Sequence, residues 1–167
     1  MRRQQKGFSL IELLIVVAII LIIAAIAIPN LMRARMAAND SSAAASERTI
    51  VTGEVGYYAA YPTLGYALLP ALGGAVPCTP LPGTGCLIDD NLATNGAALG
   101  KSGYNFVVNL VGVPPIQFDT EATPISAQTG TKAFCAMEDG VVRTNTPGVI
   151  AAAGGYAGCQ KFLPMAN

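Results

Sequence analysis

The sequence contains no histidine and no tryptophan, and charged residues make up only 12% of its 167 residues. Histidine is the commonest general base and the commonest metal ligand, so its absence removes the usual starting point for both chemistries. Serine, threonine and lysine are present but form no recognisable catalytic motif. These absences predict a protein that is not an enzyme and that carries no cofactor.

Charge of either sign is scarce and unevenly placed along the chain. Residues 1–7 carry Arg2, Arg3 and Lys6 but no acid. Without these residues, seven basic and ten acidic side chains remain, a formal charge of −3. A short basic leader on a mildly acidic body argues against nucleic acid as a partner.

Hydrophobic residues amount to 52% of the chain and are densest in residues 8–28, where Glu12 is the one charge. As a helix these residues span about 31 Å, close to the hydrocarbon thickness of a bilayer. A cleaved signal peptide is the alternative, but its apolar core is usually shorter, and here Gly7 precedes the run instead of following it. The basic residues before the span predict a cytoplasmic N-terminus.

Glu12 is the informative residue of this span. An acid inside a bilayer costs roughly 2.5–3.5 kcal/mol at the centre and less near an end, and such acids are usually functional and paired. No Lys or Arg occurs between Phe8 and Arg33. The nearest cation is therefore the α-amino group that a cut before Phe8 would create. An acid that merely reaches water at the membrane edge is the alternative.

The segment around Glu12 resembles the processing signature of type IV prepilins. The resemblance lies in Lys6-Gly7-Phe8-Ser9-Leu10-Ile11-Glu12-Leu13 and continues through residues 15–20 and 25–30. It implies cleavage between Gly7 and Phe8 by a prepilin peptidase, N-methylation of Phe8, and a role for Glu12 in assembly. Leu21 departs from the pattern, because many relatives place a glycine there.

The resemblance also implies a function: the structural subunit of a type IV pilus, assembled through its N-terminal helix for adhesion or motility. The implied partners are other copies of the chain in a helical homopolymer, the prepilin peptidase, the inner-membrane assembly machinery and, before assembly, lipid. The chain would cross the inner membrane once and later reach the extracellular pilus. A type II secretion pseudopilin is one alternative. A monomeric membrane-anchored binding module is another, although Glu12 would have no evident use there.

After Pro29 the pattern changes from uniformly apolar to amphipathic. Pro62 marks the expected end, so one helix of about 80 Å is predicted over residues 8–61, with a kink at Pro29 where a backbone donor is missing. The residues expected on its apolar face are Ala44, Ile50, Val51, Val55 and Tyr58. Glu47 and Glu54 are expected mostly elsewhere around the helix.

Residues 62–103 are rich in proline and glycine and predict a long irregular connection. Strand signals follow at residues 104–111, 115–118, 132–137 and 141–144, with the hairpin signal Asp139-Gly140 between the last two. These patterns predict an α+β chain in which a small antiparallel sheet packs on the amphipathic half-helix, as the resemblance to the type IV pilin fold implies. The expected domains are a leader (1–7), a transmembrane or filament-core helix (8–29), its amphipathic half (30–61) and an exported globular domain (62–167).

Four cysteines follow the apolar segment: Cys78, Cys86, Cys135 and Cys159. Their spacings exceed the roughly two to four residues between the ligands of structural zinc sites. An even number beyond a membrane segment favours disulfides in an oxidising compartment. Several connectivities are possible, and proximity favours Cys78–Cys86 and Cys135–Cys159, because a glycine-rich tail can fold Cys159 back onto the strand of Cys135.

Three acidic pairs supply candidate calcium oxygens: Asp89-Asp90, Asp119 with Glu121, and Glu138-Asp139. A resemblance to the major secretion pseudopilins would imply a calcium site in this region. Calcium needs roughly six to eight oxygens, and no pair has the spacing of an EF-hand loop, so solvated turns and no metal are predicted. Tyr57, Tyr58 and Tyr61 are expected to pack in the core rather than to form a stacking platform.

Overall fold

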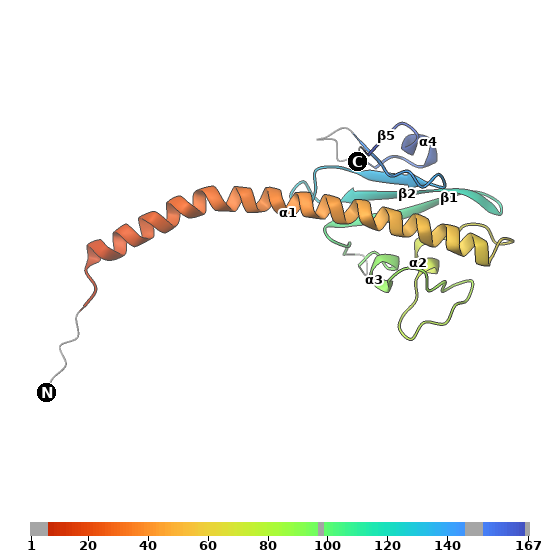
Figure 1. The fold of residues 1–167 in the computed structure, drawn as a ribbon, viewed down its shortest axis with the longest axis horizontal. Coiled ribbons are helices and arrows are strands. Elements are labelled where there is room, and N and C mark those ends of the chain that lie inside the picture. The colour runs from red at the N-terminus through yellow and green to blue at the C-terminus, as the bar shows by residue number, and fades with distance from the viewer. Residues whose placement is uncertain (1–6, 97–98, 146–151, 166–167) are drawn as a thin grey trace. The chain divides into compact units, whose positions relative to one another are not determined.

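The computed structural model describes residues 7–96, 99–145 and 152–165. The chain divides into two compact units, Met1–Arg35 and Met36–Asn167. Helix α1, Leu10–Ala60, contributes to both units (Figure 1). Residues 1–6 of the expected leader lie outside the described residues.

The single long helix predicted over residues 8–61 is confirmed. Helix α1 starts two residues later than predicted and ends one residue earlier. Pro29 lies inside α1, and the residues on both sides of it are helical. Proline removes one backbone donor and crowds the preceding turn, which bends a helix without necessarily ending it. The kink at Pro29 stays a prediction.

The second unit contains a five-stranded antiparallel sheet in which every strand pairs with its neighbours in sequence. The strands are β1 (Tyr104–Gly112), β2 (Pro115–Pro124), β3 (Phe134–Met137), β4 (Arg143–Thr144) and β5 (Leu163–Pro164). Gly140 has a positive φ of 73° in the turn between β3 and β4, as the Asp-Gly signal predicts. The predicted antiparallel meander is therefore confirmed.

Four short elements and the extension of one strand were not predicted. The connection over residues 62–103 contains the one-turn helices α2 (Leu69–Leu72) and α3 (Asp90–Ala93), and α4 (Tyr156–Cys159) and β5 follow near the end of the chain. Such elements are too short to show a periodic pattern. Strand β2 continues six residues beyond the expected stretch because its acids are buried in the sheet rather than solvated in a turn.

The core lies between the second half of α1 and one face of the sheet. Its largest fully buried apolar side chains are Ile50, Leu72, Leu92, Tyr104 and Phe118. Successive side chains of β2 point to opposite faces of the sheet, so those that do not face α1 lie on its other face. The segment around α4 covers that other face (Figure 1). The sheet therefore has two covered faces in this region.

The predicted apolar face of α1 was partly wrong. Val55 is 51% exposed and Tyr58 is 38% exposed, whereas Glu47 and Glu54 are 0% exposed. Seven residues separate Asp40 from Glu47 and Glu47 from Glu54, a spacing that keeps all three on one side of a helix. Asp40, Glu47 and Glu54 therefore belong to the buried stripe of α1, the side of the helix that faces the core. A prediction from hydrophobicity alone placed this stripe incorrectly, because it assigned Glu47 and Glu54 mostly elsewhere around the helix.

Candidate functional site

The first half of α1 exposes an apolar surface all around the helix. Its large apolar side chains from Phe8 to Met32 are between 46% and 85% exposed within the chain. One helix among the described residues is long and apolar enough to cross a membrane, and its best 18-residue window has a mean hydropathy of 3.3 with none of it buried. This surface exceeds the isolated apolar patches of soluble monomers, so it is suited to contact lipid or other apolar helices.

The structure brings Ser9 and Glu12 together at the start of this helix. The Oε2 atom of Glu12 accepts a hydrogen bond of 3.0 Å from the backbone N–H of Ser9. Gly7 and Phe8 precede the helix, and no heavy atom lies within 4 Å of the position that a Cβ would take at Gly7. The Gly7–Phe8 bond therefore lies outside α1 and is open within the described chain.

Both expected disulfides are present. Cys78 pairs with Cys86 at a Cα–Cα distance of 5.9 Å, and Cys135 pairs with Cys159 at 5.8 Å. The first closes a short loop in the connection after α1, and Tyr57 Oη donates a 2.5 Å hydrogen bond to the Pro82 carbonyl of that loop. The second ties α4 to β3 inside a small buried cluster.

Asp40 and Glu54, two acids of the buried stripe, hold different segments against α1. Asp40 accepts hydrogen bonds from Tyr104 Oη at 2.6 Å and from Thr131 Oγ1 at 2.6 Å. Glu54 accepts one from the backbone N–H of Ala67 at 3.0 Å, just before α2. Asp40 therefore positions the start of β1 and the loop before β3, and Glu54 positions the loop before α2.

Glu47 lies between these two acids on α1, and its neighbour is Thr120 of β2. Neither carboxyl oxygen of Glu47 makes a hydrogen bond of normal geometry with the Thr120 hydroxyl. Burial raises the pKa of Glu47 well above its usual value, Thr120 opposes this rise, and Glu121 and Asp119 add to it. Burial also raises the pKa of Glu54 to about 7, against the opposing hydrogen bond from Ala67. Both groups therefore favour the neutral acid more than an exposed glutamate does.

Of the two acids on the other face of β2, Glu121 holds the C-terminal segment and Asp119 bonds to β1. Asp119 accepts a 2.9 Å hydrogen bond from Asn109, and Glu121 accepts one of 2.6 Å from the backbone N–H of Gly155. Tyr156 donates a short hydrogen bond to Glu138. The prediction of solvated turns was therefore wrong for Asp119 and Glu121, which are buried in a strand.

Two of the remaining candidate calcium acids, Asp89 and Asp139, have local partners. Asp89 accepts a 2.9 Å hydrogen bond from the N–H of Leu92 at the start of α3 and pairs with Lys101 at 3.1 Å. Asp139 pairs with Arg143. Across residues 7–96, 99–145 and 152–165, no group of three or more His, Cys, Asp or Glu side chains is placed to hold a metal ion.

The tyrosines at the end of α1 make two separate ring contacts, Tyr57 with Tyr61 and Tyr58 with Tyr66. Tyr57 is buried, as expected for a core residue, whereas Tyr58 is partly exposed. The ring of Tyr58 stacks on Tyr66 with centroids 4.9 Å apart, and Tyr66 contacts Phe118 of β2 at 4.6 Å. Tyr61 and Tyr66 are partly buried and pack against the core.

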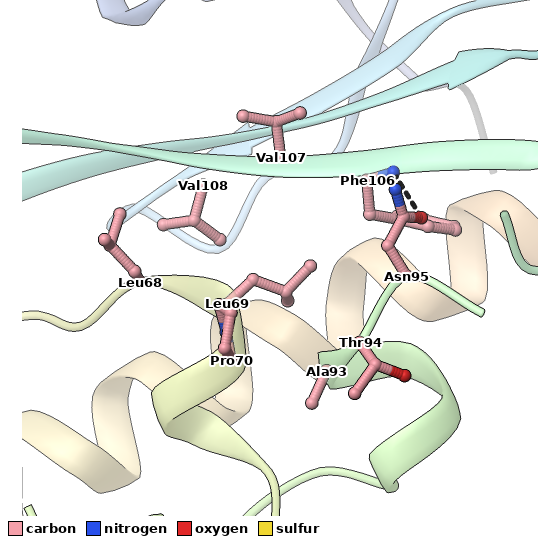
Figure 2. A pocket seen from close by; sticks show the side chains of 9 residues that line it. All are labelled: Leu68, Leu69, Pro70, Ala93, Thr94, Asn95, Phe106, Val107 and Val108. Carbon is pink, nitrogen blue, oxygen red and sulfur yellow. Dashed lines mark hydrogen bonds between the residues drawn. The ribbon is translucent and has the colours of Figure 1, made fainter. Parts of the chain in front are cut away.

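A pocket of about 260 Å³ lies beside the outer edge of β1 (Figure 2). Its lining residues are Leu68, Leu69, Pro70, Ala93, Thr94, Asn95, Phe106, Val107 and Val108. The Asn95 side chain accepts a 3.0 Å hydrogen bond from the N–H of Phe106, so it caps one position of this edge strand. The lining is otherwise mostly apolar.

A long helix, apolar in its first half and packed by its second half on an antiparallel meander, is the α+β layout of the type IV pilin fold. A family model, the prokaryotic N-terminal methylation motif, matches residues 2–28. The N-terminal segment of this chain therefore carries a prokaryotic N-terminal methylation motif and is similar to that of a type IV pilin.

A curated relative extends this finding. The type IV wide pilus major component PilA4 of Thermus thermophilus is 67% identical to the chain over 39 residues. That stretch is 23% of this chain and spans 30% of the relative's length. No solved structure matches the chain significantly.

Proposed function

We propose that the chain is the structural subunit of a type IV pilus. The supporting observation is the exposed apolar half of α1, most of which lies within the matched N-terminal methylation motif. In this proposal residues 1–7 are a leader that is cut from Phe8, Phe8 is then N-methylated, and residues 8–29 hold the subunit in the inner membrane before they form the filament core.

Assembly follows from the hydrophobic effect. When the apolar half-helix leaves lipid, its surface must be buried, and identical half-helices of other copies offer the matching surface. Glu12 then enters a drier environment, where an unpaired carboxylate is costly and a paired one much less so. Its partner is the α-amino group of Phe8, on the same or an adjoining copy, and a pair between copies would fix their axial stagger.

The partners and the location follow from the same proposal. The prepilin peptidase and the inner-membrane assembly machinery act on the chain while lipid surrounds its first half. The basic leader favours a cytoplasmic N-terminus. The two disulfides suit an oxidising compartment, which supports export of residues 62–167 across the membrane and finally to the cell surface. Other copies of the chain are the main partner, and nucleic acid is not expected.

The proposal is tested by imaging surface filaments on cells with and without the gene, using an antibody against the second unit. Long labelled filaments that disappear with the gene and return on complementation would support a pilus. A short periplasmic assembly that is needed for secretion would instead identify a type II secretion pseudopilin. A chain that stays monomeric in the membrane would leave only an anchored binding module.

A further inference from the structure

The first turn of α1 carries a helix-capping sequence. Ser9 is the last residue before the helix, and Glu12 is its third helical residue, so Ser9-Leu10-Ile11-Glu12 has the S-x-x-E pattern of a capping box. In such a box the glutamate side chain reaches back to the backbone N–H of the capping residue. The 3.0 Å hydrogen bond from Ser9 N–H to Glu12 Oε2 is this contact.

The neighbouring backbone bond agrees with this assignment. The N–H of Leu13 donates to the carbonyl of Ser9 at 3.3 Å, so Ser9 supplies the first acceptor of the helix while lying outside it. Among the described residues the Ser9 hydroxyl makes no hydrogen bond. The cap therefore depends on the carboxyl group of Glu12 and the backbone of Ser9, and not on the serine side chain.

We propose that Glu12 caps α1 within the single subunit, and that this cap fixes the start of the helix next to the Gly7–Phe8 bond. A helix start leaves backbone N–H groups without partners, and in a hydrocarbon environment water does not satisfy them. The carboxylate satisfies one of them and lies at the positive end of the helix dipole. The acid is thereby partnered before any second copy is present.

The proposed cap also determines what happens to the new terminus. This step rests on the proposed function, in which the chain is cut before Phe8. The cut would leave Phe8 as the one residue ahead of the capping residue Ser9. The new α-amino group would then belong to Phe8, the residue directly before Ser9, whose N–H donates to Glu12. Pairing between copies therefore exchanges a local hydrogen bond for a charge pair, and the same carboxyl group serves both states in turn.

Two substitutions at Glu12 separate the cap from the charge pair. Glu12→Gln keeps a side-chain acceptor but removes the charge, whereas Glu12→Ala removes both. Ser9→Ala keeps the backbone N–H and is the matched control. The measurement is amide exchange and backbone chemical shifts of residues 9–13 in the full mature chain, in lipid nanodiscs.

We expect helical shifts from Leu10 onward in the unchanged chain, in Ser9→Ala and in Glu12→Gln. In Glu12→Ala the amides of residues 9–13 should exchange about fivefold faster, as the loss of one cap implies. Unchanged exchange in Glu12→Ala would overturn the cap. Filament formation by Glu12→Gln would contradict the charge pair of the proposed function without affecting the cap, so the two failures are distinguishable.

Discussion

Glu54 is a carboxyl group whose ionisation is coupled to folding. Burial raises its pKa to about 7 from a usual value of 4.5. A raised pKa in the folded state means that the folded chain binds more protons than the unfolded chain, so its stability is greatest below the unfolded pKa. We expect the free energy of unfolding to fall as the pH rises from about 4.5 to about 7.

Denaturant unfolding of the mature chain in detergent, measured across this pH range, tests the expectation. Glu54→Gln should make the fall with pH less steep, because the amide oxygen can still accept from Ala67 but does not titrate in this range, while Glu47 still contributes to the fall. Asp90→Asn changes an exposed acid and should leave the profile unaltered. Stability that rises with pH through this window would contradict the account.

Asp40 and Glu47 predict opposite effects of substitution on the same helix. Asp40 accepts three hydrogen bonds, so Asp40→Ala should lower the free energy of unfolding by roughly 2–3 kcal/mol. Neither carboxyl oxygen of Glu47 has a hydrogen-bond partner and burial raises its pKa, so Glu47→Gln, which removes the cost of ionising this group, should stabilise the chain at pH 7. Thermal and denaturant unfolding of both variants measures the difference, and a loss of stability in Glu47→Gln would refute this interpretation of its burial.

Phe8 is the residue at which processing is read directly. We expect the mature chain to begin at Phe8 and to carry a methyl group on its α-amino nitrogen, because Gly7-Phe8 lies in the matched motif and outside α1. Intact-mass and peptide mass spectrometry of the chain from its native membrane measure both. A chain that retains Met1, or one cut after Ala27, would exclude prepilin-type processing.

The two disulfides differ in the length of chain that each one closes. Their sequence separations are 8 and 24 residues. In the chain-entropy model, replacing Cys78 and Cys86 by alanine should lower the free energy of unfolding by about 2.5 kcal/mol. Replacing Cys135 and Cys159 should lower it by about 3.5 kcal/mol. Unfolding of the two double variants tests the order, and a Cys86–Cys135 peptide in a non-reducing digest would contradict the connectivity.

Helix α1 and the central strands were predictable because they are long and periodic. The start and the end of α1 follow from the apolar run and from Pro62, and the hairpin between β3 and β4 follows from Asp139-Gly140. The buried face of α1 was not predictable from hydrophobicity, since Glu47 and Glu54 are buried. The successive spacing of seven residues from Asp40 to Glu47 and from Glu47 to Glu54 was the signal that could have indicated it.

The elements that the sequence did not predict depend on tertiary contacts. Helix α3 is one turn long and is stabilised by the Asp89 cap, and β5 is two residues long and pairs only with β4. The continuation of β2 has partners in Asn109 of the neighbouring strand β1 and in Gly155, which lies 34 residues beyond Glu121. The exposed first turn was the opposite case, because Ser9, Glu12 and the apolar run specify it locally.

At the scale of the molecule, the surfaces of the two units are suited to different environments. In the second unit Asp40, Glu47, Glu54, Asp119 and Glu121 are buried, so the formal acidity of the body lies largely in its core rather than on its surface. In the first unit the apolar side chains are exposed and the one acid lies in the first turn of the helix. The second unit is suited to fold in water, and the first is suited to lipid or to a bundle of identical helices.

The measurement that tests the central claim most directly is electron microscopy of surface filaments from cells that carry Glu12→Ala, Glu12→Asp or the unchanged chain. Equal amounts of each chain in the membrane fraction are the control for folding and insertion. The account predicts labelled filaments with the unchanged chain, sparse filaments with Glu12→Asp, and none with Glu12→Ala. Normal filaments at normal abundance in the Glu12→Ala cells would contradict assembly through the Glu12 charge pair.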